Sequence, residues 1–235
     1  MQLERILQKH GFGTRKGCRS LIRHHRVTVN SLACDDPFAD FPVTDLIFTV
    51  DDISWPYCEH AALMLHKPTG YECSRKPQHH PSVLDLLPVP LRERGVQPIG
   101  RLDEDTTGLL LITDDGQLNH HLSSARRKVP KVYLATTKHA VDGEQIDKLL
   151  AGVLLNDEPA PIAAAAAEIA GEYLLRLTVT EGKYHQVKRM VAAAGNRVEA
   201  LHRESVGELT LPADLQPGQW RWLSVADLEK LGYTV

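Results

Sequence analysis

The chain has 235 residues, enough to bury a core and to form one large domain, alone or with a small one. Hydrophobic residues make up 43% of it and charged residues 24%, which is typical of a globular protein and excludes disordered, collagen-like and coiled-coil chains. No apolar run approaches the roughly 18 residues of a membrane span, and the first residues, MQLERILQKH, are charged where a secretory signal is apolar. These features predict a cytoplasmic protein with no membrane partner.

The net charge of -3 conceals an uneven distribution along the chain. Residues 1–30 contain seven Lys and Arg against Glu4 alone, a local net charge of +6, and the stretches 116–141 and 182–197 contain basic residues and no acid. Residues 34–59 contain seven acids and no Lys or Arg, which predicts a solvated surface facing away from any polyanion. Three basic stretches in an acidic chain indicate a directional face for a polyanionic partner.

The amino-terminal residues predict two short helices followed by a small sheet. Leu3, Ile6 and Leu7 have helical spacing and are followed by two glycines that end the helix. A second helix begins after Thr14, a suitable N-cap, and residues 27–29 then alternate as a strand.

A domain boundary is expected where the acidic stretch ends and an apolar run begins. We therefore predict a small basic domain over 1–59 and a larger domain over 60–235. In the larger domain we expect strands at 61–66, 108–113, 132–137, 173–180 and 208–211, and helices at 116–123, 143–150, 185–194 and 224–231. The alanine run 163–167 stays open between helix and other structure. Without regular strand–helix alternation, the pattern predicts an α+β fold with a mixed, mainly antiparallel sheet.

The four cysteines form no CxxC pair and have no zinc-like spacing with histidine. We expect reduced thiols that pack as small apolar groups, and neither a metal nor a cofactor.

An acidic loop precedes one of the predicted strands. In GRLDEDTTGLLLITDDG (100–116), three consecutive acids come directly before an apolar run, so the fold delivers carboxylates to a rigid edge. From this spacing alone the acids suit either catalysis or the capping of a turn.

The same segment resembles the signature of the pseudouridine synthases. HKPTGYECS (66–74), KVYLA (131–135) and EGKYHQVKRM (181–190) resemble further blocks of that superfamily, in the expected order. The basic helix pair ending in RVTVNS resembles a small RNA-binding domain shared with a small-subunit ribosomal protein, which precedes the catalytic domain in the small-subunit rRNA uridine-516 synthase family. The resemblance implies an isomerase that converts one uridine of rRNA, most closely small-subunit 16S rRNA, to pseudouridine without cofactor or metal.

Three catalytic residues are implied by the resemblance. The family's catalytic carboxylate falls on Asp103, with Glu104 and Asp105 as bystanders; it either attacks ribose carbon 1 or removes a neighbouring ribose proton, and the sequence leaves both routes open. Tyr133 matches the tyrosine that stacks on the flipped base. Lys188 matches the cation that keeps the carboxylate ionised, where much of the superfamily has arginine.

Further contacts to RNA are expected from basic and polar side chains. In the small domain these are Arg15, Lys16, Arg19, Arg23 and Arg26; in the larger domain they are Arg101, Arg126, Arg127, Gln186 and Arg189, with Arg126 and Arg127 flanking the active site. The implied partner is rRNA within a small-subunit ribonucleoprotein precursor, and one RNA-facing surface predicts a monomer.

Three other functions stay open as alternatives. The first is a pseudouridine synthase that acts on large-subunit 23S rRNA. The second is an rRNA-binding assembly factor with an inert catalytic-like domain, against which the intact set of Asp103, Tyr133 and Lys188 argues. The third is a glycosidase that uses Asp103 and Asp105. We expect these two side chains to point to opposite sides of an extended segment, which would not suit two carboxylates flanking one bond.

Overall fold

The computed structural model describes residues 1–234 and divides the chain into two compact units. Unit 1 combines Met1–Ala61 with Leu87–Gln97, and unit 2 combines Ala62–Leu86 with the chain from Pro98 onward. The chain therefore leaves unit 1 close to the predicted boundary but returns to it once. The predicted division into functional domains at 59/60 stays a prediction.

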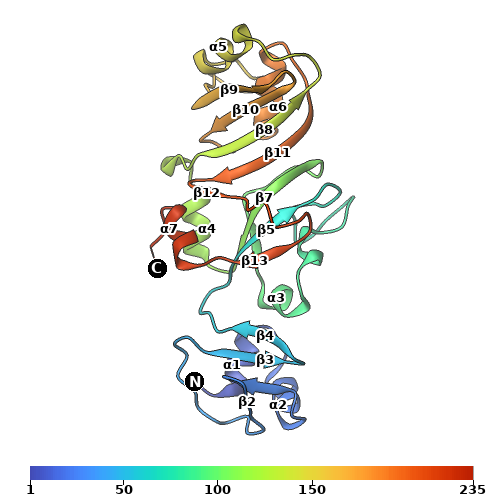
Figure 1. The fold of residues 1–235 in the computed structure, drawn as a ribbon, viewed down its shortest axis with the longest axis vertical. Coiled ribbons are helices and arrows are strands. Elements are labelled where there is room, and N and C mark those ends of the chain that lie inside the picture. Colours follow the sequence, from blue (N-terminus) through green and yellow to red (C-terminus); the bar gives the residue numbers. More distant parts are fainter. Residues whose placement is uncertain (235) are drawn as a thin grey trace. The chain divides into compact units, whose positions relative to one another are not determined.

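Unit 1 contains the two predicted helices and a small antiparallel sheet. Thr14 caps the second helix by accepting a hydrogen bond from the Gly17 N–H at 3.2 Å, as predicted. The sheet has the strand order β2-β1-β3-β4 (Figure 1). The elements are α1 (Leu3–Lys9), α2 (Arg15–Arg23), β1 (Val27–Val29), β2 (Leu32–Ala33), β3 (Ile47–Val50), β4 (Ile53–Pro56) and α3 (Val89–Arg94).

The acidic segment 34–59 is not only a solvated surface, and that prediction is wrong in part. It supplies strands β3 and β4 to the sheet. Its Asp51 forms an ion pair with Arg26, and its Glu59 forms one with Lys9. The acids therefore neutralise cations of the same unit, because folding brings the two oppositely charged stretches together.

Unit 2 is built on one large mixed sheet with the strand order β13-β5-β7-β11-β8-β10-β9, to which β6 adds on β7 and β12 on β11 (Figure 1). The β7–β11 pair is parallel, and the other pairs along that path are antiparallel, so the predicted α+β fold is confirmed. The remaining elements are β5 (Ala62–Lys67), η1 (Val83–Leu86), β6 (Gln97–Ile99), β7 (Thr106–Thr113), α4 (Gly116–Ser123), η2 (Ala125–Arg127), β8 (Lys131–Thr137), α5 (Gly143–Ala151), β9 (Ala166–Gly171), β10 (Leu174–Val179), α6 (Gln186–Ala193), β11 (Val198–Val206), β12 (Leu209–Thr210), β13 (Trp220–Trp222) and α7 (Val225–Lys230).

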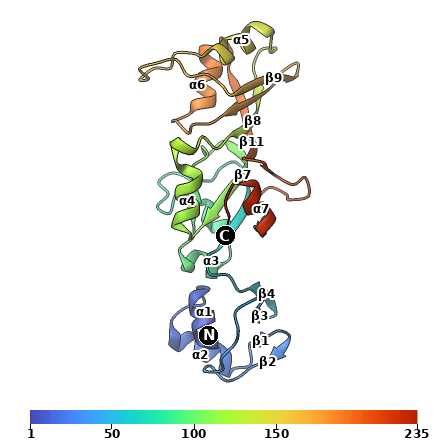
Figure 2. The same cartoon turned by 90° about the vertical axis from the view of Figure 1, so that its left-hand side faces the viewer.

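Two buried clusters fix the helices on this sheet. Leu118 of α4 packs with Leu109 and Leu111 of β7, while Met190 of α6 packs with Leu177 of β10. Figure 2 shows α5 and α6 at the end of the unit that carries β9, and α4 and α7 beside β7. Within residues 1–234, none of the helices combines the length and the apolar character needed to cross a membrane.

Four strands of this sheet were not predicted: β6, β9, β11 and β13. Strand β11 lies between β7 and β8 but carries His202, Arg203 and Glu204, so it lacks an apolar strand pattern. The alanine run left open above leads into strand β9, where pairing with β10 overrides the helix preference of alanine.

Candidate active site

A buried lysine holds the backbone of the acidic loop before β7 in place. Lys67, at the end of β5, is fully buried, and its Nζ donates to the carbonyl oxygens of Pro68 (2.9 Å), Glu104 (3.0 Å) and Thr106 (2.9 Å). Burial lowers the pKa of Lys67, while the neighbouring acids oppose that change. The clamp fixes the loop backbone, and with it the directions in which the acidic side chains leave the loop.

Two groups at the start of α6 contact the carboxylate of Asp103. The Nζ of Lys188 lies 3.2 Å from Oδ2, and the Nε2 of His185 lies 3.3 Å from Oδ1. Asp103 is partly buried, with 30% of its side chain exposed. The predicted juxtaposition of Asp103 and Lys188 is therefore present, and His185 is an additional neighbour.

Asp105, to which the resemblance gives no catalytic role, contacts the same lysine as Asp103. The Nζ of Lys188 donates to both carboxylate oxygens of Asp105, at 2.7 and 2.9 Å. Although burial alone would raise the pKa of Asp105, the hydrogen bond and charge of Lys188 lower it. Burial would lower the pKa of Lys188, but the two carboxylates raise it, so the ammonium stays charged. One ammonium thus serves two carboxylates.

The geometric argument made above against a carboxylate pair is also wrong. The Thr106 N–H donates to the Asp103 carbonyl at 3.1 Å, so the loop forms a turn rather than an extended segment. In this turn Asp103 and Asp105 both reach Lys188. The argument fails for an extended segment as well, because residues i and i+2 of extended backbone lie on the same face and only successive side chains point apart.

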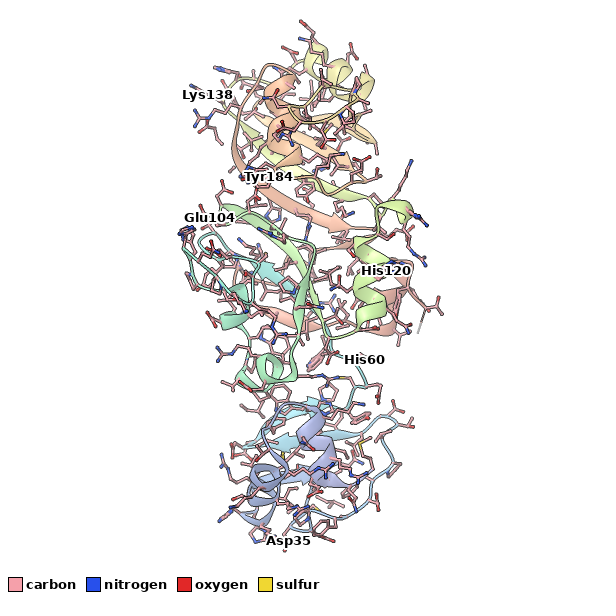
Figure 3. The ribbon with its side chains drawn as sticks, turned by 180° about the vertical axis from the view of Figure 1, so that it is seen from behind. Asp35, His60, Glu104, His120, Lys138 and Tyr184 are labelled. Carbon is pink, nitrogen blue, oxygen red and sulfur yellow. The ribbon has the colours of Figure 1, made fainter. Side chains whose placement is uncertain are left out.

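A cavity of about 690 Å³ lies around this group. The acids of the loop lie on its wall, and Figure 3 labels Glu104 and Tyr184, which both line it. The basic and imidazole groups on its wall are Lys76, His79, His80, Arg101, His185 and Lys188. Such a lining suits a polyanionic ligand, and it includes the predicted residues Asp103, Arg101 and Lys188.

One wall of the cavity is a loop organised by Glu72, which the sequence analysis did not single out. The Glu72 carboxylate accepts backbone N–H groups of Gln78 (3.0 Å), His79 (2.7 Å) and His80 (2.9 Å), and these hydrogen bonds lower its pKa to about 2. No repeating pattern of residues in the sequence predicts this loop, because one side chain binds backbone groups six to eight residues further along the chain.

Tyr133 lies on β8 opposite Arg203 of the neighbouring strand β11. The Arg203 Nη1 donates to the Tyr133 hydroxyl at 3.5 Å, and the guanidinium lies 6.0 Å from the centre of the ring. Tyr133 is not among the described residues that line the cavity, so its catalytic role stays a prediction.

Gln186 and Arg189 have internal partners in unit 2, and their expected contacts with RNA stay a prediction. Gln186 is only 6% exposed, and its Oε1 accepts the Lys183 N–H at 3.1 Å. Arg189 donates to the carbonyl oxygens of Tyr184 (3.3 Å) and Asn156. Both side chains fix the turn that precedes α6.

Arg126 and Arg127 do not flank the acidic loop, contrary to expectation. They are exposed on η2, just before the start of β8 at Lys131, which pairs with Val206 at the far end of β11. The acidic loop leads into β7 at Thr106, which pairs with the earlier part of β11. Because strand register fixes these positions, the two arginines lie at the opposite end of the sheet.

The cations of the small domain divide into paired and unpaired groups within unit 1. Arg19 binds the buried carboxylate of Glu4, and Arg26 binds Asp51. Arg15 donates to the Gln8 side chain at 3.2 Å. Lys16 and Arg23 have no ion-pair partner among the described residues.

Among residues 1–234, no cluster of three or more His, Cys, Asp or Glu side chains could hold a metal ion. All four cysteines are free thiols, and Cys73 lies on the cavity wall, where burial raises its pKa.

Comparisons with known proteins show which family this chain belongs to. The family model described as RNA pseudouridylate synthase matches residues 61–193. Proteins named ribosomal small subunit pseudouridine synthase A are similar to this chain: that of Haemophilus influenzae is 35% identical over 98% of this chain and 99% of the relative, and that of Escherichia coli K12 is 40% identical over 88% and 89%. A crystal structure of a pseudouridylate synthase covers 98% of this chain and 99% of its own, with a TM-score of 0.70 and 34% identity.

Proposed function

Because this chain belongs to the RNA pseudouridylate synthase family, we propose that it isomerises one specific uridine of small-subunit (16S) rRNA to pseudouridine. The choice of rRNA is supported by the relatives that match nearly the whole chain, which are named as small-subunit enzymes. We further propose that the protein works as a cytoplasmic monomer on rRNA within a small-subunit ribonucleoprotein precursor.

The reaction needs a carboxylate at the sugar of the target nucleotide. The bond between ribose carbon 1 and uracil nitrogen 1 breaks, the base turns, a new bond joins ribose carbon 1 to uracil carbon 5, and carbon 5 loses its proton while nitrogen 1 gains one. We assign the carboxylate to Asp103, whose Oδ2 lies 3.2 Å from the Lys188 ammonium and which lines the cavity. It serves equally for attack on ribose carbon 1 and for removal of the neighbouring ribose proton.

The observation that carries this proposal is the arrangement of Asp103 against Lys188 and His185 on the wall of one cavity. The two contacts hold the Asp103 carboxylate in a fixed position from which it can act as nucleophile or base. Asp105 takes the shorter hydrogen bonds of Lys188, which leaves the Asp103 oxygens less tightly held and accessible to a sugar.

The target base must leave its stack before Asp103 can reach its sugar. We assign the stacking role to Tyr133, whose hydroxyl then assists removal of the carbon 5 proton. Arg101 on the cavity wall supplies a cation for the RNA backbone. None of these steps calls for a cofactor.

Release of tritium from RNA labelled at uridine carbon 5 tests the function, because that hydrogen is lost only when the new glycosidic bond forms. We expect release from small-subunit rRNA or its particle with the wild-type chain and none with Asp103→Asn, which should still bind RNA. Release from large-subunit rRNA alone would correct the substrate. No release from either RNA, with binding intact, would favour the assembly-factor alternative.

A further inference from the structure

Tyr184 is an exposed aromatic side chain on the wall of the cavity. It is 74% exposed, and its ring is stacked on the ring of His185, with the centres 3.8 Å apart and an angle of 19° between the planes. One face of the Tyr184 ring is therefore covered by His185, whereas the large exposed fraction leaves the other face open to a ligand.

The backbone that carries this ring is fixed from several sides. The Gln186 N–H donates to the Lys183 carbonyl at 3.2 Å, and the Lys183 N–H donates to the Gln186 side chain at 3.1 Å. Arg189 donates to the Tyr184 carbonyl at 3.3 Å. An exposed tyrosine that only covers a surface needs no such support, whereas a rigid ring loses little entropy when a flat partner stacks on it.

His185 has a backbone conformation that side chains rarely adopt, with φ at 48°. His185 is the last residue before α6, and its conformation ends the turn there. The His185 ring then lies between Tyr184 and the acidic loop. Such strain persists only where surrounding contacts determine it, and here the bonds of Gln186 and Arg189 supply them.

Tyr184, His185 and Asp103 follow one another from the solvent inward, and this order determines which RNA base can contact the Tyr184 ring. Tyr184 stacks on His185, and the Nε2 of His185 lies 3.3 Å from Asp103. The target sugar must contact Asp103, so the imidazole separates its base from the Tyr184 ring. An adjacent nucleotide, which stays outside the pocket, reaches the open face instead.

We propose that the open face of Tyr184 stacks on the RNA base next to the target uridine. Lys76 and Arg101, which line the same cavity, supply cations for the RNA backbone next to that base. This inference rests on the proposed function, because it takes RNA as the ligand of the cavity and Asp103 as the group that meets the target sugar. Stacking on an aromatic side chain tolerates any base, because every base has a flat face.

Binding of small-subunit rRNA tests the proposal without turnover. In an Asp103→Asn background, Tyr184→Ala should raise the Kd about tenfold, which corresponds to about 1.4 kcal/mol. Tyr184→Phe should stay within about twofold of the parent, because the ring remains. Tyr173→Ala, which removes a tyrosine that is 46% exposed elsewhere in unit 2, is the matched control and should leave the Kd unchanged.

With Asp103 intact, the effect of Tyr184→Ala should fall on KM in the tritium assay rather than on kcat. Equal Kd values for Tyr184→Ala and its parent would overturn the proposal, as would an equal loss in Tyr184→Phe or in the Tyr173→Ala control. The Kd series is read separately from turnover. If the wild-type chain binds RNA but releases no tritium, the proposed function is refuted and the Kd series still tests the stacking of Tyr184. If the Asp103→Asn parent binds no RNA, both the proposed function and the stacking proposal are overturned.

Discussion

The basic groups of unit 1 and those of the cavity in unit 2 differ in what neutralises them. In unit 1, Arg19 faces Glu4, Arg26 faces Asp51 and Lys9 faces Glu59. On the cavity wall Lys188 faces Asp103 and Asp105, whereas Lys76 and Arg101, like Lys16 and Arg23 of unit 1, have no carboxylate partner among the described residues. A count of charges along the sequence therefore overstates the charge that unit 1 offers to RNA, and it gives no weight to the cavity.

The largest expected effect concerns Lys67, the buried cation beneath the acidic loop of unit 2. Lys67→Met should lower kcat/KM about a thousandfold, because it leaves three carbonyl groups around the acidic loop without their donor, each at a cost of about 1–3 kcal/mol. Tritium release measures the loss. The matched control is Lys9→Met, which removes a partly exposed cation from unit 1 and should leave turnover unchanged. Equal activity in both variants would mean that the clamp does not position the loop.

A second prediction concerns His10 of unit 1, a buried imidazole. Its Nδ1 lies 2.8 Å from the Ile6 carbonyl, and its Nε2 accepts the Cys58 N–H at 3.1 Å, so the neutral form fits the site. Burial lowers its pKa from 6.5 to about 4. The unfolded chain therefore binds more protons between these values, and the stability from this site is complete above about pH 6.5 and is lost as the pH falls towards 4.

The free energy of unfolding should fall by about 3 kcal/mol over that interval. Urea unfolding at a series of pH values, followed by the fluorescence of Trp55 in unit 1, measures it. The exposed His24 provides the control, since His24→Ala should leave the pH dependence intact. A flat profile from pH 7 to 4 would show that His10 is protonated in the folded unit.

A third prediction separates the two carboxylates that share Lys188. Lys188→Met should lower kcat/KM about a hundredfold, because Asp103 and Asp105 then repel each other without a cation between them. Asp105→Asn should cost less than tenfold, since it leaves Lys188 to Asp103. Tritium release compares the two variants. A larger loss in Asp105→Asn than in Lys188→Met would assign the essential carboxylate to Asp105.

Sequence reasoning predicted the elements whose signals are local. The helix after Thr14 has its cap within the same turn, and the helix expected at 116–123 was found with those bounds. Strand β11 was missed, because its buried Arg203 finds its partners, the Leu109 carbonyl and Tyr133, on neighbouring strands. The approach of Lys188 to Asp103 followed only from the resemblance, and the share that Asp105 takes depends on a turn that no pattern of residues reveals.

The smallest expected effect tests the pairing in unit 1 itself. If only unpaired cations bind RNA, Lys16→Ala with Arg23→Ala should flatten the plot of log Kd against log salt by about 1.4, or about 0.7 for each lost phosphate contact on single-stranded RNA. Lys9→Ala with Arg26→Ala should leave the slope nearly unchanged, because their partners Glu59 and Asp51 already neutralise them. Arg19 is left intact because its loss would strand the buried Glu4. An equal change of slope in the two double variants would mean that the ion pairs break when RNA binds. The paired cations of the first 30 residues would then contribute to RNA binding as well as the unpaired ones.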